Sequence, residues 1–148
     1  MKDYKLRIKQ LDKQLSGFTM TTIHNNWFQI IRESLGMSTR YLAKKLGITP
    51  GRVAQLQKAE SDGSITLRNL QKIAKALECE MIYAFVPKES LENIIETKAK
   101  EIAKERINRV AHSMSLEQQG TSNDALKVQY DELVQELIAQ HPKKLWTE

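Results

Sequence analysis

The chain has 148 residues, of which 41% are apolar, enough for one domain with an appendage and a hydrophobic core. Its single cysteine excludes an intrachain disulfide and a thiolate metal cluster, and no apolar run approaches the roughly 20 residues of a membrane span. The net charge of +5 indicates a polyanionic partner only weakly, and the N-terminus lacks the apolar centre of a signal peptide. We therefore expect a cytoplasmic protein.

Residues 3–17 predict a basic amphipathic helix. Apolar side chains recur there every three or four residues, at Tyr4, Ile8, Leu11, Leu15 and Phe18. Lysines and Arg7 surround this stripe. The helix either packs on a partner or neighbouring chain, or contacts DNA phosphates. Residues 1–24 are expected to form this arm and its connector.

Residues 25–78 predict a compact domain of four short helices. The expected N-terminal caps are Asn25 or Asn26, Ser38, Thr49 and Thr66, because their side chains can accept a hydrogen bond from the first turn. Gly36 and Gly47 follow the first two apolar patterns and are expected to end helices. The domain therefore has four helices in about 55 residues.

The central stretch of this domain is residues 38–59, which predicts a helix-turn-helix. Gly47, Ile48 and Thr49 form the break between two short apolar patterns, and Pro50 suits the first turn of the second helix. Ile48 is expected to pack in the angle between the helices. A plain pair of core helices is the alternative.

A helix-turn-helix places the N-terminal end of its second helix in the DNA major groove. The residues expected there are Thr49, Pro50, Gly51, Arg52 and Gln55. Arg52 suits guanine and Gln55 suits adenine. Phosphate contacts are expected from the side chains of Thr39, Arg40, Lys58 and Arg68.

Residues 79–87 predict one short strand, since the run is apolar, rich in β-formers and stopped by Pro87. A lone strand leaves its backbone groups unpaired, so we expect it to pair with the same strand of a second copy. The residues expected to dimerise are Met81, Ile82, Tyr83 and Phe85. A helix continuing from Leu77 is the alternative.

Residues 88–148 predict a C-terminal helical region that binds a partner or serves as structure. Two amphipathic helices are expected at 90–114 and 124–140, the first capped by Ser90. Trp146 is expected to be anchored in a groove. Residues 1–88 carry 15 Lys and Arg and 7 Asp and Glu, whereas residues 89–148 carry 8 Lys and Arg and 11 Asp and Glu. This asymmetry suits a basic DNA-binding part followed by an acidic part with another role.

The predicted fold class is mainly α. It consists of a helix-turn-helix bundle of four to five helices, one strand that pairs across a dimer, and a two-helix C-terminal extension. No histidine spacing indicates metal ligation, and there is no Gly-rich phosphate loop or nucleophile elbow. We therefore expect that the protein is not an enzyme and that it binds no cofactor and no metal.

The motif and its flanking helices, from about Trp27 to Leu77, resemble the Xre/Cro/C1 helix-turn-helix family. The chain departs at Glu78, where members often have glycine. The following strand resembles that of antitoxins in this family, which dimerise through an intermolecular sheet. Segments along nearly the whole chain, among them RVAHSMSLEQQ and the terminal KLWTE, resemble the family called mobile mystery protein A.

This second resemblance implies a transcriptional autorepressor that acts as the antitoxin of a Fic-domain toxin encoded beside it. Fic enzymes are inhibited by a Ser/Thr-x-x-x-Glu helix, which Ser113 and Glu117 match, although Gln118 follows where Gly or Asn is expected. Thr97 and Glu101 match the same short pattern, so Glu117 can equally be a solvated residue. The alternatives are a phage-type or restriction-controller repressor without a toxin partner, and a Fic inhibitor whose helix-turn-helix is only a scaffold.

Overall fold

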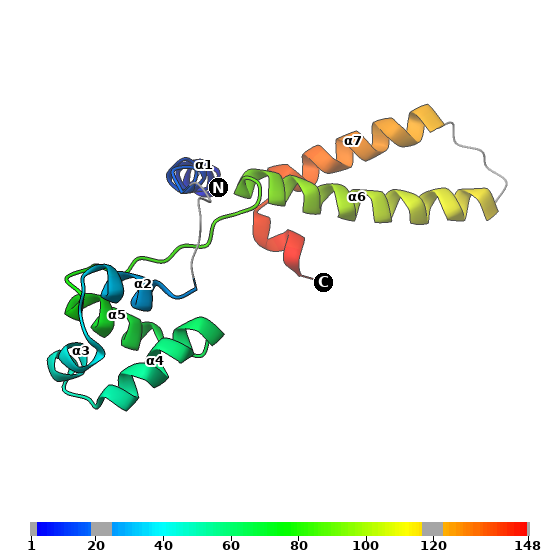
Figure 1. The fold of residues 1–148 in the computed structure, drawn as a ribbon. Helices are drawn as coiled ribbons and strands as arrows, with labels where there is room; N and C mark the ends of the chain where they lie inside the picture. Colours follow the sequence, from blue (N-terminus) through cyan, green and yellow to red (C-terminus); the bar gives the residue numbers. More distant parts are fainter. Residues whose placement is uncertain (1–2, 19–24, 117–122, 148) are drawn as a thin grey trace. The chain divides into compact units, whose positions relative to one another are not determined.

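The computed structural model describes residues 3–18, 25–116 and 123–147. Within these residues the chain forms seven α-helices, one short 3-10 helix and no strand, which confirms the mainly helical fold class. The helices belong to two compact units, coloured along the sequence in Figure 1. The HTH unit is Met20–Phe85, and the terminal unit combines Met1–Thr19 with Val86–Glu148.

The HTH unit contains four helices, as the sequence predicts: α2 (Trp27–Ser34), α3 (Thr39–Leu46), α4 (Pro50–Asp62) and α5 (Leu67–Ala76). The last three begin at predicted caps, since Ser38, Thr49 and Thr66 each accept a backbone N–H from three residues ahead. Each cap satisfies a donor that the first turn of its helix leaves unpaired.

The core of the HTH unit is apolar and draws on all four helices. Its buried members are Phe28, Leu42, Ala43, Val53, Leu56, Ile73, Ala76 and Leu77. Ile48, in the turn between α3 and α4, packs against this core as predicted. Leu42 and Val53 are fully buried, so the facing surfaces of α3 and α4 are fixed by packing.

The start of α2 differs from the prediction. Asn26 occupies the cap position, but its side chain makes no capping hydrogen bond. The N–H of Phe28 donates instead to Oε1 of Glu60 on α4, at 2.9 Å, and Asn25 donates its amide N–H to the Ser61 carbonyl at 3.2 Å. The end of α4 therefore caps the beginning of α2.

The predicted strand at residues 80–86 is not found: within the described chain, residues 79–87 are neither helical nor paired in a sheet. The helical alternative is also wrong. Helix α5 ends at Ala76, and Glu78 takes a left-handed φ of 57° that turns the backbone out of the helix. A strand requires a hydrogen-bonding partner, and the described part of this chain provides none for this segment.

The terminal unit is built on a helical hairpin of α6 (Leu91–Leu116) and α7 (Asn123–Ala139), which pack side by side in Figure 1. Its buried residues are Ala99, Ile102, Ala103, Val134, Leu137 and Leu145. Leu145 belongs to the 3-10 helix η1 (Pro142–Trp146), which also packs on α6. Leu145, which is 2% exposed, anchors the C-terminal tail, whereas the neighbouring Trp146 is 56% exposed, contrary to the prediction.

The N-terminal helix α1 (Asp3–Leu15) packs on α6 of its own chain. Asp12 accepts hydrogen bonds from the backbone N–H groups of Leu91, at 2.6 Å, and Glu92, at 3.2 Å. Ser90, the predicted cap, accepts from Asn93 at 3.0 Å. At the N-terminal end of α1, the Tyr4 hydroxyl donates to the carbonyl of Gln140, which directly follows α7, at 2.6 Å.

Candidate nucleic-acid interface

The turn between α3 and α4 sets the direction of the second helix. Gly47 takes a φ of 69°, a left-handed conformation that ends α3 and that residues with a Cβ rarely adopt. Thr49 then caps α4, its Oγ1 accepting the Arg52 N–H at 3.1 Å, and Pro50 occupies the first turn. Because Val53 and Leu56 are buried on one side of α4, the opposite side must face solvent.

The residues predicted to enter the major groove lie together on that outward side. Thr49, Pro50, Gly51, Arg52 and Gln55 are all exposed at the N-terminal end of α4. A methyl group placed on Gly51 would meet only Thr49 Oγ1, at 3.9 Å, so the surface here is open. This end of α4 is therefore exposed and sterically free to approach a ligand.

Arg52 and Gln55 contact each other. Nη1 of Arg52 donates to Oε1 of Gln55 at 3.2 Å. A guanidinium has no acceptor, so the Gln55 atom that faces it must be the carbonyl oxygen, and the Gln55 NH₂ group remains a donor. In this arrangement Arg52 keeps its other N–H groups for a base edge, and Gln55 keeps both its NH₂ donors and the second lone pair of its carbonyl oxygen.

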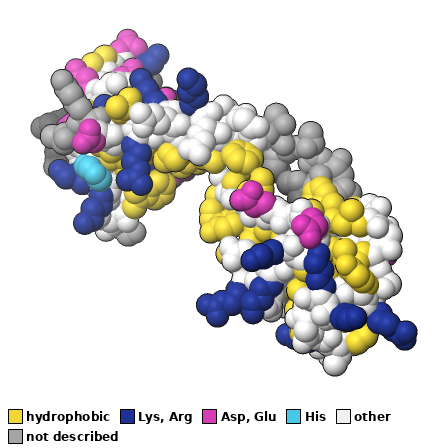
Figure 2. All heavy atoms as spheres, turned by 90° about the vertical axis from the view of Figure 1, so that its left-hand side faces the viewer, with side chains coloured by type: hydrophobic (Ala, Val, Ile, Leu, Met, Phe, Trp, Pro, Cys, Tyr) yellow, Lys and Arg dark blue, Asp and Glu magenta, His cyan; other side chains and the backbone are white. Residues whose placement is uncertain are grey.

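The predicted phosphate-binding residues are distributed over α3, α4 and α5. Thr39 and Arg40 begin α3, Lys58 lies on the middle of α4, and Arg68 lies in the first turn of α5. Arg40, Lys58 and Arg68 are exposed, and Thr39 is half-buried. Figure 2 shows Lys and Arg side chains, in dark blue, projecting from the HTH unit, the lower part of the view.

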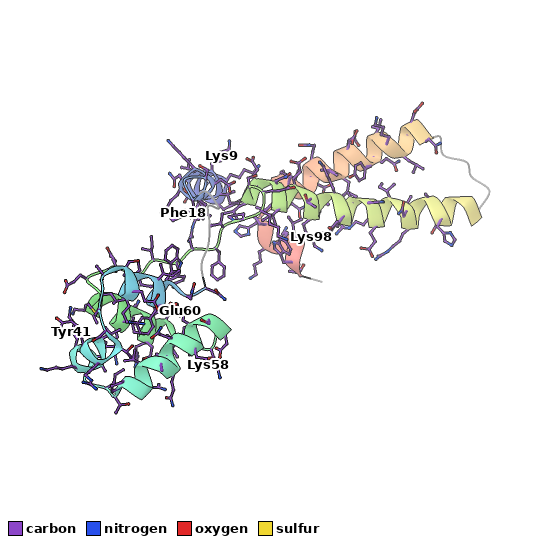
Figure 3. The ribbon with its side chains drawn as sticks, viewed as in Figure 1. Lys9, Phe18, Tyr41, Lys58, Glu60 and Lys98 are labelled. Atoms are coloured by element: carbon purple, nitrogen blue, oxygen red, sulfur yellow. The ribbon has the colours of Figure 1, made fainter. Side chains whose placement is uncertain are left out.

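Two further features of α3 were not predicted. Tyr41 is 57% exposed and carries its phenol on the outer surface of the motif, as the label in Figure 3 marks. Lys45 forms an ion pair with Glu78 at 2.9 Å, and this hydrogen bond raises the pKa of Lys45 and lowers the pKa of Glu78. Tyr41 follows directly on Thr39 and Arg40, which was the available signal for including it.

Glu60 links α4 to the start of α2 through its hydrogen bond with Phe28. Its carboxylate lies between α4 and the start of α2, where partial burial raises its pKa and the hydrogen bond from Phe28 acts in the opposite direction. Figure 3 labels Glu60 and Lys58, which both belong to α4. Glu60 thus has a structural partner on another helix of its own unit.

The residues proposed from the Fic resemblance are only partly described. Ser113 lies exposed near the end of α6, and Glu117 lies outside the described residues. Among the residues that the structure describes, no group of His, Cys, Asp and Glu side chains is arranged to hold a metal ion. In the same residues no helix is both long and apolar enough to cross a membrane.

Residues 28–83 match the family model described as helix-turn-helix. Residues 28–83 are a helix-turn-helix domain. The match runs from the second residue of α2 past the end of α5 and includes the outward end of α4, and it supports a DNA-binding regulator of the Xre/Cro type. No curated protein and no solved structure matches the chain significantly.

Proposed function

We propose that the protein is a sequence-specific DNA-binding transcriptional regulator. The observation that carries the proposal is the exposed N-terminal end of α4, held in place by a packed helix-turn-helix. Arg52 lies where the recognition helix of such a motif meets base edges, and Arg40, Lys58 and Arg68 are further exposed positive charges of the same unit.

The test is a gel shift with the DNA upstream of the protein's own gene, at a stated salt concentration. Arg52→Ala is expected to remove about 1–3 kcal/mol of discrimination between the site and unrelated DNA, because a bidentate contact to guanine is lost. Lys127→Ala, an exposed lysine of the terminal unit, is the matched control. Unchanged discrimination in Arg52→Ala refutes this assignment.

Lys58 is assigned a different role from Arg52. Its exposed ammonium group on α4 suits a phosphate, which carries no sequence information. Lys58→Ala is therefore expected to weaken binding to all sequences alike and to reduce the slope of log K against log salt by about 1. A loss confined to the specific site would instead make Lys58 a base-reading residue.

We further propose that the regulator is a homodimer on a palindromic operator, joined through residues 79–87. This segment is apolar, exposed and unpaired in the single chain, which supports a partner of the same sequence. Two recognition helices related by a two-fold axis match two half-sites about one helical turn apart. Sedimentation that finds a monomer at micromolar concentration would exclude the dimer.

The resemblance to mobile mystery protein A supports an extension of this role, in which the protein is the antitoxin of a Fic-domain toxin. The terminal unit has a core of its own, separate from that of the HTH unit, which supports a second role for it. Co-expression of the Fic protein with Glu117→Gly tests the inhibitory glutamate, and Glu101→Gly, in the second match to the pattern, is the control. Full suppression of AMPylation by Glu117→Gly dismisses Glu117.

The gel shift and the identity of the neighbouring gene together separate the alternatives. A Fic inhibitor that uses the motif only as a scaffold gives no shift with its own promoter. A phage-type or restriction-controller repressor shifts DNA but has no Fic gene beside its own.

A further inference from the structure

The segment after α5 is exposed to an unusual degree for its composition. Ile82, Tyr83 and Phe85 are 78%, 66% and 90% exposed. Among the described residues, none makes a hydrogen bond to the backbone of residues 80–86. Solvent-exposed aromatic side chains and unpaired backbone groups in one short run are the properties of an open strand edge.

The charges of this segment are separated to its two ends. Glu80 precedes the apolar run and Lys88 follows it, and no charged residue lies between them. When two copies pair antiparallel, the acidic end of each meets the basic end of the other. Opposite charges directly across a strand pair are favourable, and like charges are unfavourable.

Two residues restrict the register of this pairing. Pro87 has no N–H, so it must occupy a position that makes no hydrogen bond across the pair. Glu78 is excluded from the strand, because its φ of 57° is left-handed and its carboxylate is already paired with Lys45. A register that places Lys88 opposite Glu78 is therefore unfavourable, and charge complementarity favours the register that places Lys88 opposite Glu80.

We propose that two copies pair antiparallel about Ala84, so that Ala84 of each copy faces Ala84 of the other. This inference rests on the proposed dimer and specifies its geometry. Glu80 then lies opposite Lys88 of the second copy at both ends, and the hydrogen-bonded pairs are 80–88, 82–86 and 84–84. Pro87 falls opposite Met81, at a position that needs no N–H.

The same register gives each face of the pair a matched set of side chains. Tyr83 lies opposite Phe85 twice on one face, and Ile82 lies opposite Val86 twice on the other. Aromatic pairs across strands stabilise a sheet, which accounts for side chains that a single copy leaves in water.

Disulfide cross-linking of the full chain in a Cys79→Ser background tests the register. Ala84→Cys is expected to form a disulfide-linked dimer under oxidising conditions, because hydrogen-bonded residues that face each other have Cα atoms about 5.5 Å apart. Tyr83→Cys is the matched control. In the proposed register the Cα atoms of position 83 in the two copies lie diagonally across the strand pair, about 8 Å apart, which is beyond the reach of a disulfide.

Charge exchange tests the same register without cysteine. Glu80→Lys and Lys88→Glu are each expected to weaken the dimer about tenfold in sedimentation, since each creates two like-charge pairs. The double variant is expected to restore the wild-type dimer. Glu80 and Lys88 of one strand are about 26 Å apart, so such a rescue reports contact between copies.

Cross-linking at Tyr83→Cys but not at Ala84→Cys overturns the register while leaving the dimer in place. A wild-type monomer overturns the register together with the dimer. The gel shift with wild-type protein remains a separate measure of DNA binding. The substituted side chains are solvent-exposed, and circular dichroism checks that each variant keeps its helices.

Discussion

At the scale of single residues, the sequence was most informative where a side chain acts on its own neighbours. Ser38, Thr49, Thr66 and Ser90 could be recognised as caps because each bonds a backbone N–H only three residues away. Glu60 could not be recognised, since its partner Phe28 is 32 residues distant in sequence. A cap supplied from another helix leaves no local pattern.

Glu60 also provides a prediction of pH dependence. Burial raises the pKa of Glu60 in the folded protein, so the folded state holds this proton more tightly than the unfolded state. By linkage, the contribution of this proton to stability is fully present below the unfolded pKa and is lost as pH rises through the folded pKa. Glu60→Gln is expected to remove this pH dependence while keeping the acceptor for Phe28.

Comparison of Glu60→Ala with Glu60→Gln separates the effect of the carboxylate charge from that of the hydrogen bond that caps α2. Glu60→Ala leaves the Phe28 N–H without its acceptor and is expected to lower the free energy of unfolding by about 1 kcal/mol at neutral pH. Chemical denaturation of the alanine and glutamine variants between pH 4 and 7 measures both effects. If the two variants are equally stable at pH 7, the hydrogen bond to Phe28 has no stabilising role.

At the scale of elements, the helices could be located from periodicity, but their partners could not. The predictions of helices at 3–17, 90–114 and 124–140 agree with α1, α6 and α7 to within a few residues. Packing of α1 on α6 joins residues about 80 apart, and nothing in the local pattern of either helix indicates the other. The segment at 79–87 has the composition of a strand, but pairing depends on a partner that one chain does not supply.

Asp12 is one of the residues that attach α1 to the rest of the terminal unit. Its carboxylate accepts from the first two N–H groups of α6, where a negative charge also suits the helix dipole. Asp12→Ala is expected to destabilise the terminal unit by about 1–2 kcal/mol in thermal denaturation. Asp131→Ala, an exposed carboxylate on α7, is the control, and an equal loss from both would argue against the cap.

At the scale of the whole molecule, two separate apolar cores predict two separable unfolding events. Leu42 belongs to the core of the HTH unit and Leu145 to that of the terminal unit, and both are almost fully buried. Leu42→Ala and Leu145→Ala are each expected to cost about 2–5 kcal/mol, in different units. Calorimetry should show each variant lowering a different transition, and one shared shift would indicate a single cooperative domain.

The order of the elements along the chain has a consequence for proteolysis. The chain leaves the terminal unit after α1 and returns to it at Val86, so the HTH unit is inserted within the other. One protease cut in the exposed segment 79–85 yields a fragment with α1 to α5 and a fragment with α6, α7 and η1. These fragments should still co-elute, because Asp12 and Tyr4 hold α1 on the second fragment. Release of the DNA-binding part requires another cut between α1 and α2, so a singly nicked regulator keeps its two parts together.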